Sequence, residues 1–197
     1  MTSNKTRSAY HHGDLANAVL DEVERIIEEQ GLENVSLRAC AKAVGVSHSA
    51  LFRHYADKRD LLTAFAARGA RRMAASVNQQ IADVPQGKRF LAVGLAYIDY
   101  ARKNPGAFRM IFREDALNPD HPDYAQAMQQ MAAILAIGGH GSEDTDALSP
   151  KALLAWSSVH GIAMLCIDGS LSRDVAQAEL EALIEQSLRA LAPVLLE

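Results

Sequence analysis

The stretch GVSHSALFRHYADK, residues 45–58, decides how the rest of this chain is interpreted. It begins with a glycine between two valines, and its polar side chains alternate with the large apolar side chains of Leu51, Phe52 and Tyr55. Ser47 is placed to cap a short helix, HSALFRHY, and Gly45 can take the positive φ that a tight turn requires. The pattern therefore predicts a short amphipathic helix directly after a sharp turn.

Helices are also predicted on both sides of this stretch. Apolar residues recur at helical spacing over residues 15–27, and Ser36 is placed to cap a second helix, LRACAKAV. Asp57 and Asp60 resemble a capping box that opens a helix running to about Ile81. Two short helices joined by a glycine turn, with a longer helix before them, have the proportions of a helix-turn-helix.

The remainder of the chain shows helical spacing as well, and strand patterns are nearly absent. We therefore predict an all-α fold of about nine helices, with an N-terminal three-helix helix-turn-helix domain and a helical C-terminal domain. The expected ranges are 1–56 for the helix-turn-helix domain, 57–82 for a linker helix and 83–197 for the helical C-terminal domain. The segment GGHGSEDTD, residues 138–146, is expected to be an exposed loop.

The totals favour a globular protein that stays in the cytoplasm. The chain has 197 residues, of which 49% are hydrophobic, enough for a substantial core. We see no apolar run that approaches the roughly 18 residues of a membrane span, and no secretion signal. Cys40 and Cys166 are expected to be buried thiols.

Charge is distributed unevenly along the chain. Residues 1–80 carry 11 Lys and Arg against 9 Asp and Glu, whereas residues 81–197 carry 9 against 15. Within 38–72 there are eight cations and two anions, so a phosphate-bearing partner would bind there. Arg68, Arg71 and Arg72 lie too far along the linker helix to reach a DNA groove, and we expect them in ion pairs or on a solvated face.

Several polar side chains of this basic segment are placed to touch DNA. On the helix after Gly45, His48, Ser49 and Arg53 point outward and can bond base edges. Ser36, His54 and Lys58 lie at helix ends, where they and free backbone N–H groups can clamp phosphates. An ordinary solvated face would account for any one of these residues alone. The glycine turn, the caps and the local charge together favour DNA contact.

The segments YHHGDL (residues 10–15) and LRACAKAVGVSHSALFRHYADKRDLL (37–62), with the nine-helix layout, resemble the TetR family of bacterial transcriptional regulators. The close resemblance covers about residues 10–65. It implies a homodimer that binds a double-stranded DNA operator and a small-molecule effector. It also implies base contacts from Arg38, His48, Ser49 and Arg53, and phosphate contacts from Ser36, His54 and Lys58.

Two aromatic residues depart from the family pattern. Many members have a tyrosine whose hydroxyl bonds a phosphate where this chain has Phe52, so we expect Phe52 to pack in the core. Tyr55 falls where a buried phenylalanine is more usual. Its ring is expected to be buried, while its hydroxyl either contacts a phosphate or caps the core.

A second constellation is WSSVHGIAMLC, residues 156–166, in which Trp156 and His160 share one helix face. It resembles the family's C-terminal region of the Trp/His-Gly (WHG-like) type. His160 is either a polar anchor for a ligand or a hydrogen-bonded core histidine, and Gly161 either admits a ligand or lets helices pack. A pocket for an apolar effector is predicted from adaptable and aromatic side chains: Tyr97, Phe108, Phe112, Met128, Met131, Trp156, His160 and Met164.

No catalytic constellation is apparent in the sequence. There is no P-loop, no GxSxG, no GxGxxG and no Glu followed three residues later by His, so we expect no enzyme, no cofactor and no metal site. The favoured function is a DNA-binding regulator, a repressor released from a palindromic operator by a largely apolar ligand, and dimeric through its last two helices. The alternative is an all-α protein-interaction module without sequence-specific DNA binding.

Overall fold

The structure is a computed structural model that describes residues 12–138, 149–171 and 175–196. These residues form nine α-helices and three short 3-10 helices, with no strand among them: α1 (His12–Gln30), η1 (Leu32–Asn34), α2 (Leu37–Val44), α3 (His48–Leu51), α4 (Lys58–Ile81), η2 (Gln86–Lys88), α5 (Arg89–Lys103), α6 (Pro105–Ile111), η3 (Glu114–Ala116), α7 (Pro122–Gly138), α8 (Pro150–Ile167) and α9 (Gln177–Leu196). The all-α prediction is confirmed. Most of the predicted loop at 138–146 lies outside the described residues.

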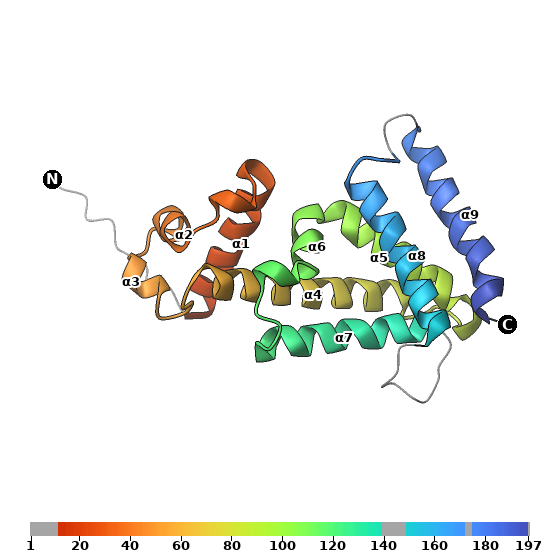
Figure 1. The fold of residues 1–197 in the computed structure, drawn as a ribbon, viewed down its shortest axis with the longest axis horizontal. Helices are drawn as coiled ribbons and strands as arrows, with labels where there is room; N and C mark the ends of the chain where they lie inside the picture. The colour runs from red at the N-terminus through yellow and green to blue at the C-terminus, as the bar shows by residue number, and fades with distance from the viewer. Residues whose placement is uncertain (1–11, 139–148, 172–174, 197) are drawn as a thin grey trace.

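Helices α1, α2 and α3 form a head at one end of the long helix α4 (Figure 1). The Ser36 hydroxyl accepts the backbone N–H of Ala39 at 3.1 Å and so caps α2. Gly45 then ends α2 with a φ of 79°, in the left-handed region where a side chain is unfavourable. Ser47 accepts the N–H of Ala50 at 3.2 Å and starts α3. These local features, all predicted, produce the sharp turn between the two helices.

Helix α3 is shorter than the predicted HSALFRHY, because it ends at Leu51. The N–H groups of His54 and Tyr55 both donate to the carbonyl of Leu51, at 2.9 and 3.0 Å, which turns the chain out of the helix. This turn carries the ring of Tyr55 into the core, where it is buried. Arg53 therefore lies in the turn after α3 rather than on the helix.

Helix α4 begins with the predicted pair of aspartates. Asp57 accepts the N–H of Asp60 at 2.8 Å, and Asp60 accepts the N–H of Ala56 at 2.9 Å. The second bond goes to the residue before the N-cap rather than to the N-cap itself, so the capping box is shifted by one position. Both bonds fix the direction in which α4 leaves the head.

An ion-pair network fastens α1 to α4. The guanidinium of Arg68 is buried between Asp21, at 2.5 Å, and Glu24, at 3.1 Å. Arg72 binds Glu24 at 3.0 Å, while Arg71 stays on the exposed face. The prediction of ion pairs and a solvated face for these arginines is confirmed. The head is thus held on α4 by charge as well as by apolar packing.

Helix α5 is the centre of the C-terminal part, and α4, α6, α7, α8 and α9 all contact it. This position explains why α5 is apolar nearly all round: its buried residues include Phe90, Tyr97, Ile98 and Tyr100. The helices α8 and α9 form the outer layer beyond α5, at the end of the molecule opposite the head (Figure 1).

Helix α8 differs from every expectation for a core helix. Only Val159 and Ala163 are buried on it, and Cys166, expected in the core, is partly exposed while Cys40 is buried. The helix has 18 residues with a mean hydropathy of 1.3, so by length and composition alone it could cross a membrane. This corrects the expectation that no apolar segment approaches the length of a membrane span. A single helix of this kind is weak evidence for a span. Its exposed apolar face needs another explanation.

Candidate functional site

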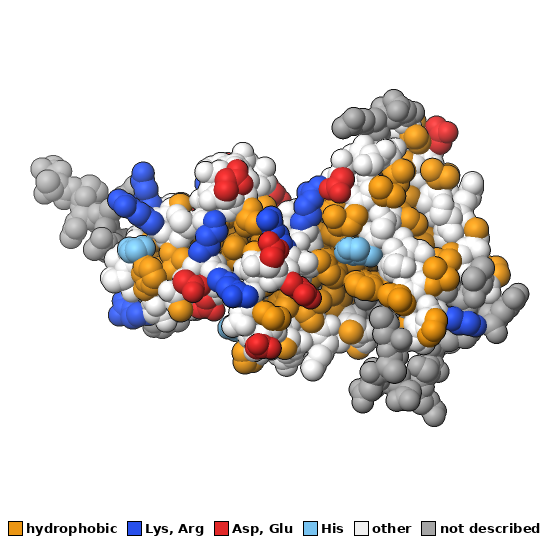
Figure 2. All heavy atoms as spheres, in the orientation of Figure 1, with side chains coloured by type: hydrophobic (Ala, Val, Ile, Leu, Met, Phe, Trp, Pro, Cys, Tyr) orange, Lys and Arg blue, Asp and Glu red, His pale blue; other side chains and the backbone are white. Residues whose placement is uncertain are grey.

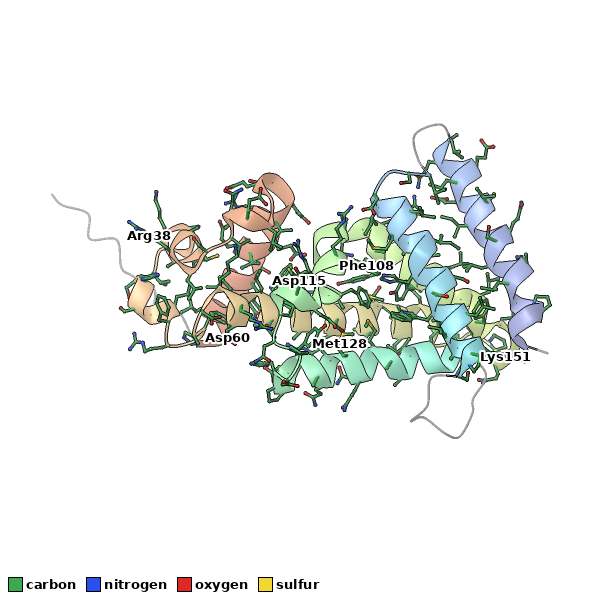
Figure 3. All side chains as sticks on the ribbon, viewed as in Figure 1. Arg38, Asp60, Phe108, Asp115, Met128 and Lys151 are labelled. Atoms are coloured by element: carbon green, nitrogen blue, oxygen red, sulfur yellow. The ribbon has the colours of Figure 1, made fainter. Side chains whose placement is uncertain are left out.

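The head exposes a polar face on α2 and α3. Arg38, His48, Ser49 and Arg53, the four residues for which base contacts were predicted, are all exposed. Arg38 projects from the head in Figure 3. Beneath this face Leu51 is fully buried, so α3 is anchored by one side and presents the other to solvent. The arrangement leaves hydroxyl, imidazole and guanidinium groups free of the core and able to bond base edges.

The predicted phosphate contacts are placed around this face. The oxygen of Ser36 caps α2, which leaves the hydroxyl proton available to a phosphate. The ammonium of Lys58 donates to the carbonyl oxygens of Leu32 and Glu33, at 3.1 and 3.3 Å, and so ties η1 to the start of α4. His54 lies exposed in the turn after α3. These contacts with phosphate stay predictions.

Tyr55 behaves as expected in one respect. Its side chain is buried, and burial raises the pKa of the phenol above its ordinary value, so the hydroxyl is protonated at neutral pH. The prediction of a buried ring is confirmed. A protonated hydroxyl can donate to a phosphate or to an acceptor in the core.

Phe52 was expected in the core, and this expectation is wrong. Its side chain is 47% exposed, and its ring meets the edge of the His48 ring with centroids 4.5 Å apart and planes at 89°. The early end of α3 is the physical reason, because the turn brings Tyr55 rather than Phe52 into the space beside Leu51. The polar face of the head therefore contains one large apolar ring.

The second constellation forms an aromatic cluster that α5, α6 and α8 build together. The Tyr97 hydroxyl and His160 Nδ1 are 2.9 Å apart, and the His160 ring lies 5.6 Å from Phe108, 4.6 Å from Phe112 and 5.7 Å from Trp156. Five of the eight predicted pocket residues are thus brought together. Tyr97 and Phe108 are fully buried and form the back of the cluster, whereas Phe112, Trp156 and His160 are only partly buried.

The electrostatics of the cluster favour neutral groups. Burial lowers the pKa of His160, so its imidazole is uncharged at neutral pH. Burial also raises the pKa of Tyr97, partly offset by the indole of Trp156, so its phenol keeps its proton. The Trp156 Nε1–H group is buried near that phenol, but no residue in the described ranges accepts a hydrogen bond of good geometry from it. The Tyr97 bond fits the core interpretation of His160, and the partial exposure fits the anchor interpretation.

The three predicted methionines are placed less specifically. Met131 is buried on α7, and Met128 and Met164 pack against the general core with partly exposed side chains. Figure 3 labels Met128 on α7 and Phe108 within the body of the domain. A groove of about 410 Å³ lies elsewhere, between the end of α1 and α6, and no predicted pocket residue lines it: Ile27, Glu28, Leu32, Pro105, Gly106, Arg109, Met110 and Arg113. Sequence reasoning gave no signal for this groove.

Helices α8 and α9 expose most of the remaining large apolar side chains. Leu153, Leu154, Leu165 and Leu183 are each between 42% and 47% exposed. At Gly161 an added Cβ would meet no atom within 4 Å, so nothing described in this chain packs against that glycine. If Gly161 lets helices pack, as one of its two predicted roles requires, the second helix is not among the described residues of this chain. Leu154, Ser158, Gly161 and Leu165 instead follow one another at helical spacing along a single outward stripe.

The comparisons with known proteins agree with this geometry. Residues 19–65 match the family model described as bacterial regulatory proteins, tetR family, and residues 90–191 match the model described as tetracyclin repressor-like, C-terminal domain. The HTH-type transcriptional regulator YobS of Bacillus subtilis (strain 168) is 23% identical over 161 residues, which cover 79% of this chain and 81% of that protein.

Solved structures show the same fold. A protein of unknown function from Rhodococcus sp. RHA1 has 25% sequence identity and a TM-score of 0.77, covering 97% of this chain and 100% of that chain. A TetR family transcription regulator from Marinobacter aquaeolei VT8 has 17% identity and a TM-score of 0.65, covering 89% and 94%. Since the C-terminal family model spans more than half of the residues and the N-terminal model covers the helix-turn-helix, this chain belongs to the TetR family of helix-turn-helix transcriptional regulators.

Proposed function

We propose that this protein is a cytoplasmic, dimeric repressor that binds a palindromic operator through its head and leaves it when a small ligand binds the C-terminal domain. The observation that carries the proposal is the exposed polar face of α2 and α3, held in place by the buried side chains of Leu51 and Tyr55. Residues 1–56 are assigned to DNA, 57–82 to the linker helix and 83–197 to ligand and dimer.

On the operator, the head divides its contacts between bases and backbone. Arg38, His48, Ser49 and Arg53 are assigned to base edges, because they are exposed on the helices that can enter a major groove. The phosphate contacts are assigned to the residues at the helix ends: Ser36, His54, Tyr55 and Lys58. Phosphate contacts position the head, and base contacts select the sequence.

Dimerisation is assigned to α8 and α9. Their exposed leucines form an apolar surface at the end of the molecule away from the head, as the orange patches over these helices in Figure 2 show. Two reading heads fit successive major grooves when they are about 34 Å apart, so a dimer on the far side of the C-terminal domains sets their spacing. A partner helix packed on α8 would also explain its exposed apolar face, with no need for a membrane.

The aromatic cluster is assigned to the effector. Phe112, Trp156 and His160 reach the surface while Tyr97 and Phe108 back them, so an apolar ligand would meet rings on one side and a neutral imidazole as its polar anchor. A ligand that binds more tightly when the heads are wrongly spaced would draw the dimer off DNA. Coupling of this kind is typically about 1 to 3 kcal/mol, or roughly 5- to 150-fold in operator affinity.

The test starts with genomic fragments selected through repeated rounds of binding to the full-length protein. Fluorescence anisotropy then measures affinity for the selected duplex against sodium chloride concentration, and six to ten phosphate contacts predict a loss of about 10³- to 10⁵-fold between 50 and 200 mM salt. His48→Ala and Ser49→Ala should change which bases matter, whereas Lys58→Ala should weaken all duplexes alike.

Arg25→Ala is the matched control for Lys58→Ala. Arg25 is a head cation whose guanidinium is already paired with Glu22 and Glu29, both on α1. We expect this variant to bind DNA like the wild type. If the selected fragments bound no better than random duplex, the regulator would not act through this face, and if Lys58→Ala changed base preference, the sorting of the contacts would be reversed.

A further inference from the structure

Among the side chains that the structure describes between Leu15 and Asp57, Phe52 is the one large apolar side chain that is exposed. The other exposed large apolar residues lie on α8 and α9, where a second copy of the chain would cover them. The core of the head does not need Phe52, because Leu51 and Tyr55 on either side of the turn fill that space. The ring is therefore available to a partner that approaches the polar face.

The neighbours of Phe52 define where that partner lies. Its ring is held edge to face against His48, one helical turn earlier, and Ser49 and Arg53 beside it are exposed as well. His48 and Ser49 carry the base contacts of the proposed function, on which this inference rests. A ring in contact with His48 would reach the same part of the major groove as the imidazole does.

The chemistry of the ring limits what it can recognise. A phenylalanine has no group that donates to a phosphate oxygen, and it offers base edges no hydrogen bond. The apolar group that the major groove presents is the C5-methyl of thymine, which apolar side chains contact in direct readout. A methylated cytosine carries the same methyl group at the same position.

We propose that Phe52 reads the C5-methyl group of one thymine in each operator half-site, with His48 fixing the orientation of its ring. The ring and the methyl group shield each other from water, so the contact adds specificity without adding a phosphate contact. Phe52, which was expected in the core, would thus help to determine the sequence specificity of the head.

The experiment replaces each thymine of the selected operator by uracil, one position per half-site at a time, which removes the methyl group and no hydrogen bond. For the wild type, one such position should lower affinity about fourfold per half-site, the effect of losing one buried methyl group. In Phe52→Ala the thymine and uracil operators should bind equally, and in Phe52→Leu the preference for thymine should persist in reduced form. Unchanged thermal melting of both variants shows that the exposed ring was not needed for folding.

The outcomes separate this inference from the proposed function. If the wild type binds the operator but tolerates uracil at every position, the methyl contact is absent while the DNA-binding function stands. Equal weakening of thymine and uracil operators by Phe52→Ala, with the preference retained, would place the ring on the sugar-phosphate backbone and overturn the inference. A gain of about fourfold on methylating one cytosine per half-site, abolished in Phe52→Ala, would assign the same contact to methylcytosine.

Discussion

The head and the α8–α9 pair both leave broad surfaces uncovered within one chain, but the exposed chemistry is opposite. Among the large side chains described as exposed on the head, Phe52 is the apolar one and the others are charged or polar, whereas α8 and α9 expose four leucines beside their polar residues. Figure 2 shows blue, pale blue and red side chains on the head at one end and orange patches over α8 and α9 at the other. Two different kinds of partner are therefore expected at the two ends.

The two surfaces differ in the free energy of leaving each of them exposed to water without a partner. A polar face is solvated by water, so it is stable in the absence of DNA. Its binding to DNA is weakened by salt. An apolar face costs about 25 cal/mol for each Å² left in water, which favours a lasting partner. We infer that the dimer is the permanent assembly and that the operator is the reversible one.

The largest effect is expected from a charge in the apolar surface. Leu165→Asp places a carboxylate on the outward stripe of α8, where a partner helix would desolvate it. Sedimentation equilibrium should show a monomer at micromolar concentration, and operator affinity should fall at least about 100-fold, or about 2.7 kcal/mol, because two linked heads are needed.

The matched control is Gln130→Asp, which adds the same charge at an exposed position of α7. This variant should remain dimeric and bind the operator normally. A dimeric Leu165→Asp protein would show that the exposed leucines contact something other than a second copy. The apolar surface of α8 and α9 would then not be the dimer interface.

The sequence predicted the features that depend on residues close together in the chain. The caps by Ser36, Ser47 and Asp57 each join atoms three residues apart, and the turn at Gly45 depends on that residue's own φ. Such contacts form wherever the local sequence allows them. For this reason the helix-turn-helix could be predicted almost completely.

The failures depend on distant or competing contacts. Phe52 is exposed because α3 ends early to bury Tyr55, a competition that helical spacing cannot reveal. Tyr97 was predicted in one pocket with Trp156 and His160, but helical spacing could not predict its hydrogen bond to His160, 63 residues away. The last two helices were predicted to carry the dimer interface, and the packed structure adds that Leu153, Leu154 and Leu165 are the exposed leucines of α8.

A pair of glycines, one at each end of the molecule, should give a smaller effect. Adding a Cβ at either would meet no atom within 4 Å, so only the backbone conformation differs: φ is 79° at Gly45, while Gly161 is helical. In the monomeric Leu165→Asp background, Gly45→Ala should destabilise the fold by about 1 kcal/mol. Gly161→Ala should stabilise it by about 0.5 to 1 kcal/mol, as measured by urea unfolding.

The two glycine variants check each other. A loss of stability in Gly161→Ala within the monomer would mean that part of this chain packs against α8 after all. In the wild-type background the same substitution should raise the dimer dissociation constant, because the proposed interface brings a partner helix against the small residues of the outward stripe. An unchanged constant would move the helix crossing away from Gly161.

The smallest effect is expected from pH. Burial lowers the pKa of His160 below its ordinary value of 6.5, so the folded protein binds fewer protons at this site than the unfolded chain. Stability should therefore fall as pH drops through about 6.5 and level off below the folded pKa. The urea midpoint of His160→Gln should fall less than that of the wild type between pH 7.5 and 5.

Tyr97→Phe removes the hydrogen bond to His160 but keeps the imidazole buried, so this variant should retain the wild-type pH dependence at a lower overall stability. If Tyr97→Phe lost that dependence instead, the hydroxyl rather than burial would control the imidazole, and the cluster would be a polar site rather than an apolar one.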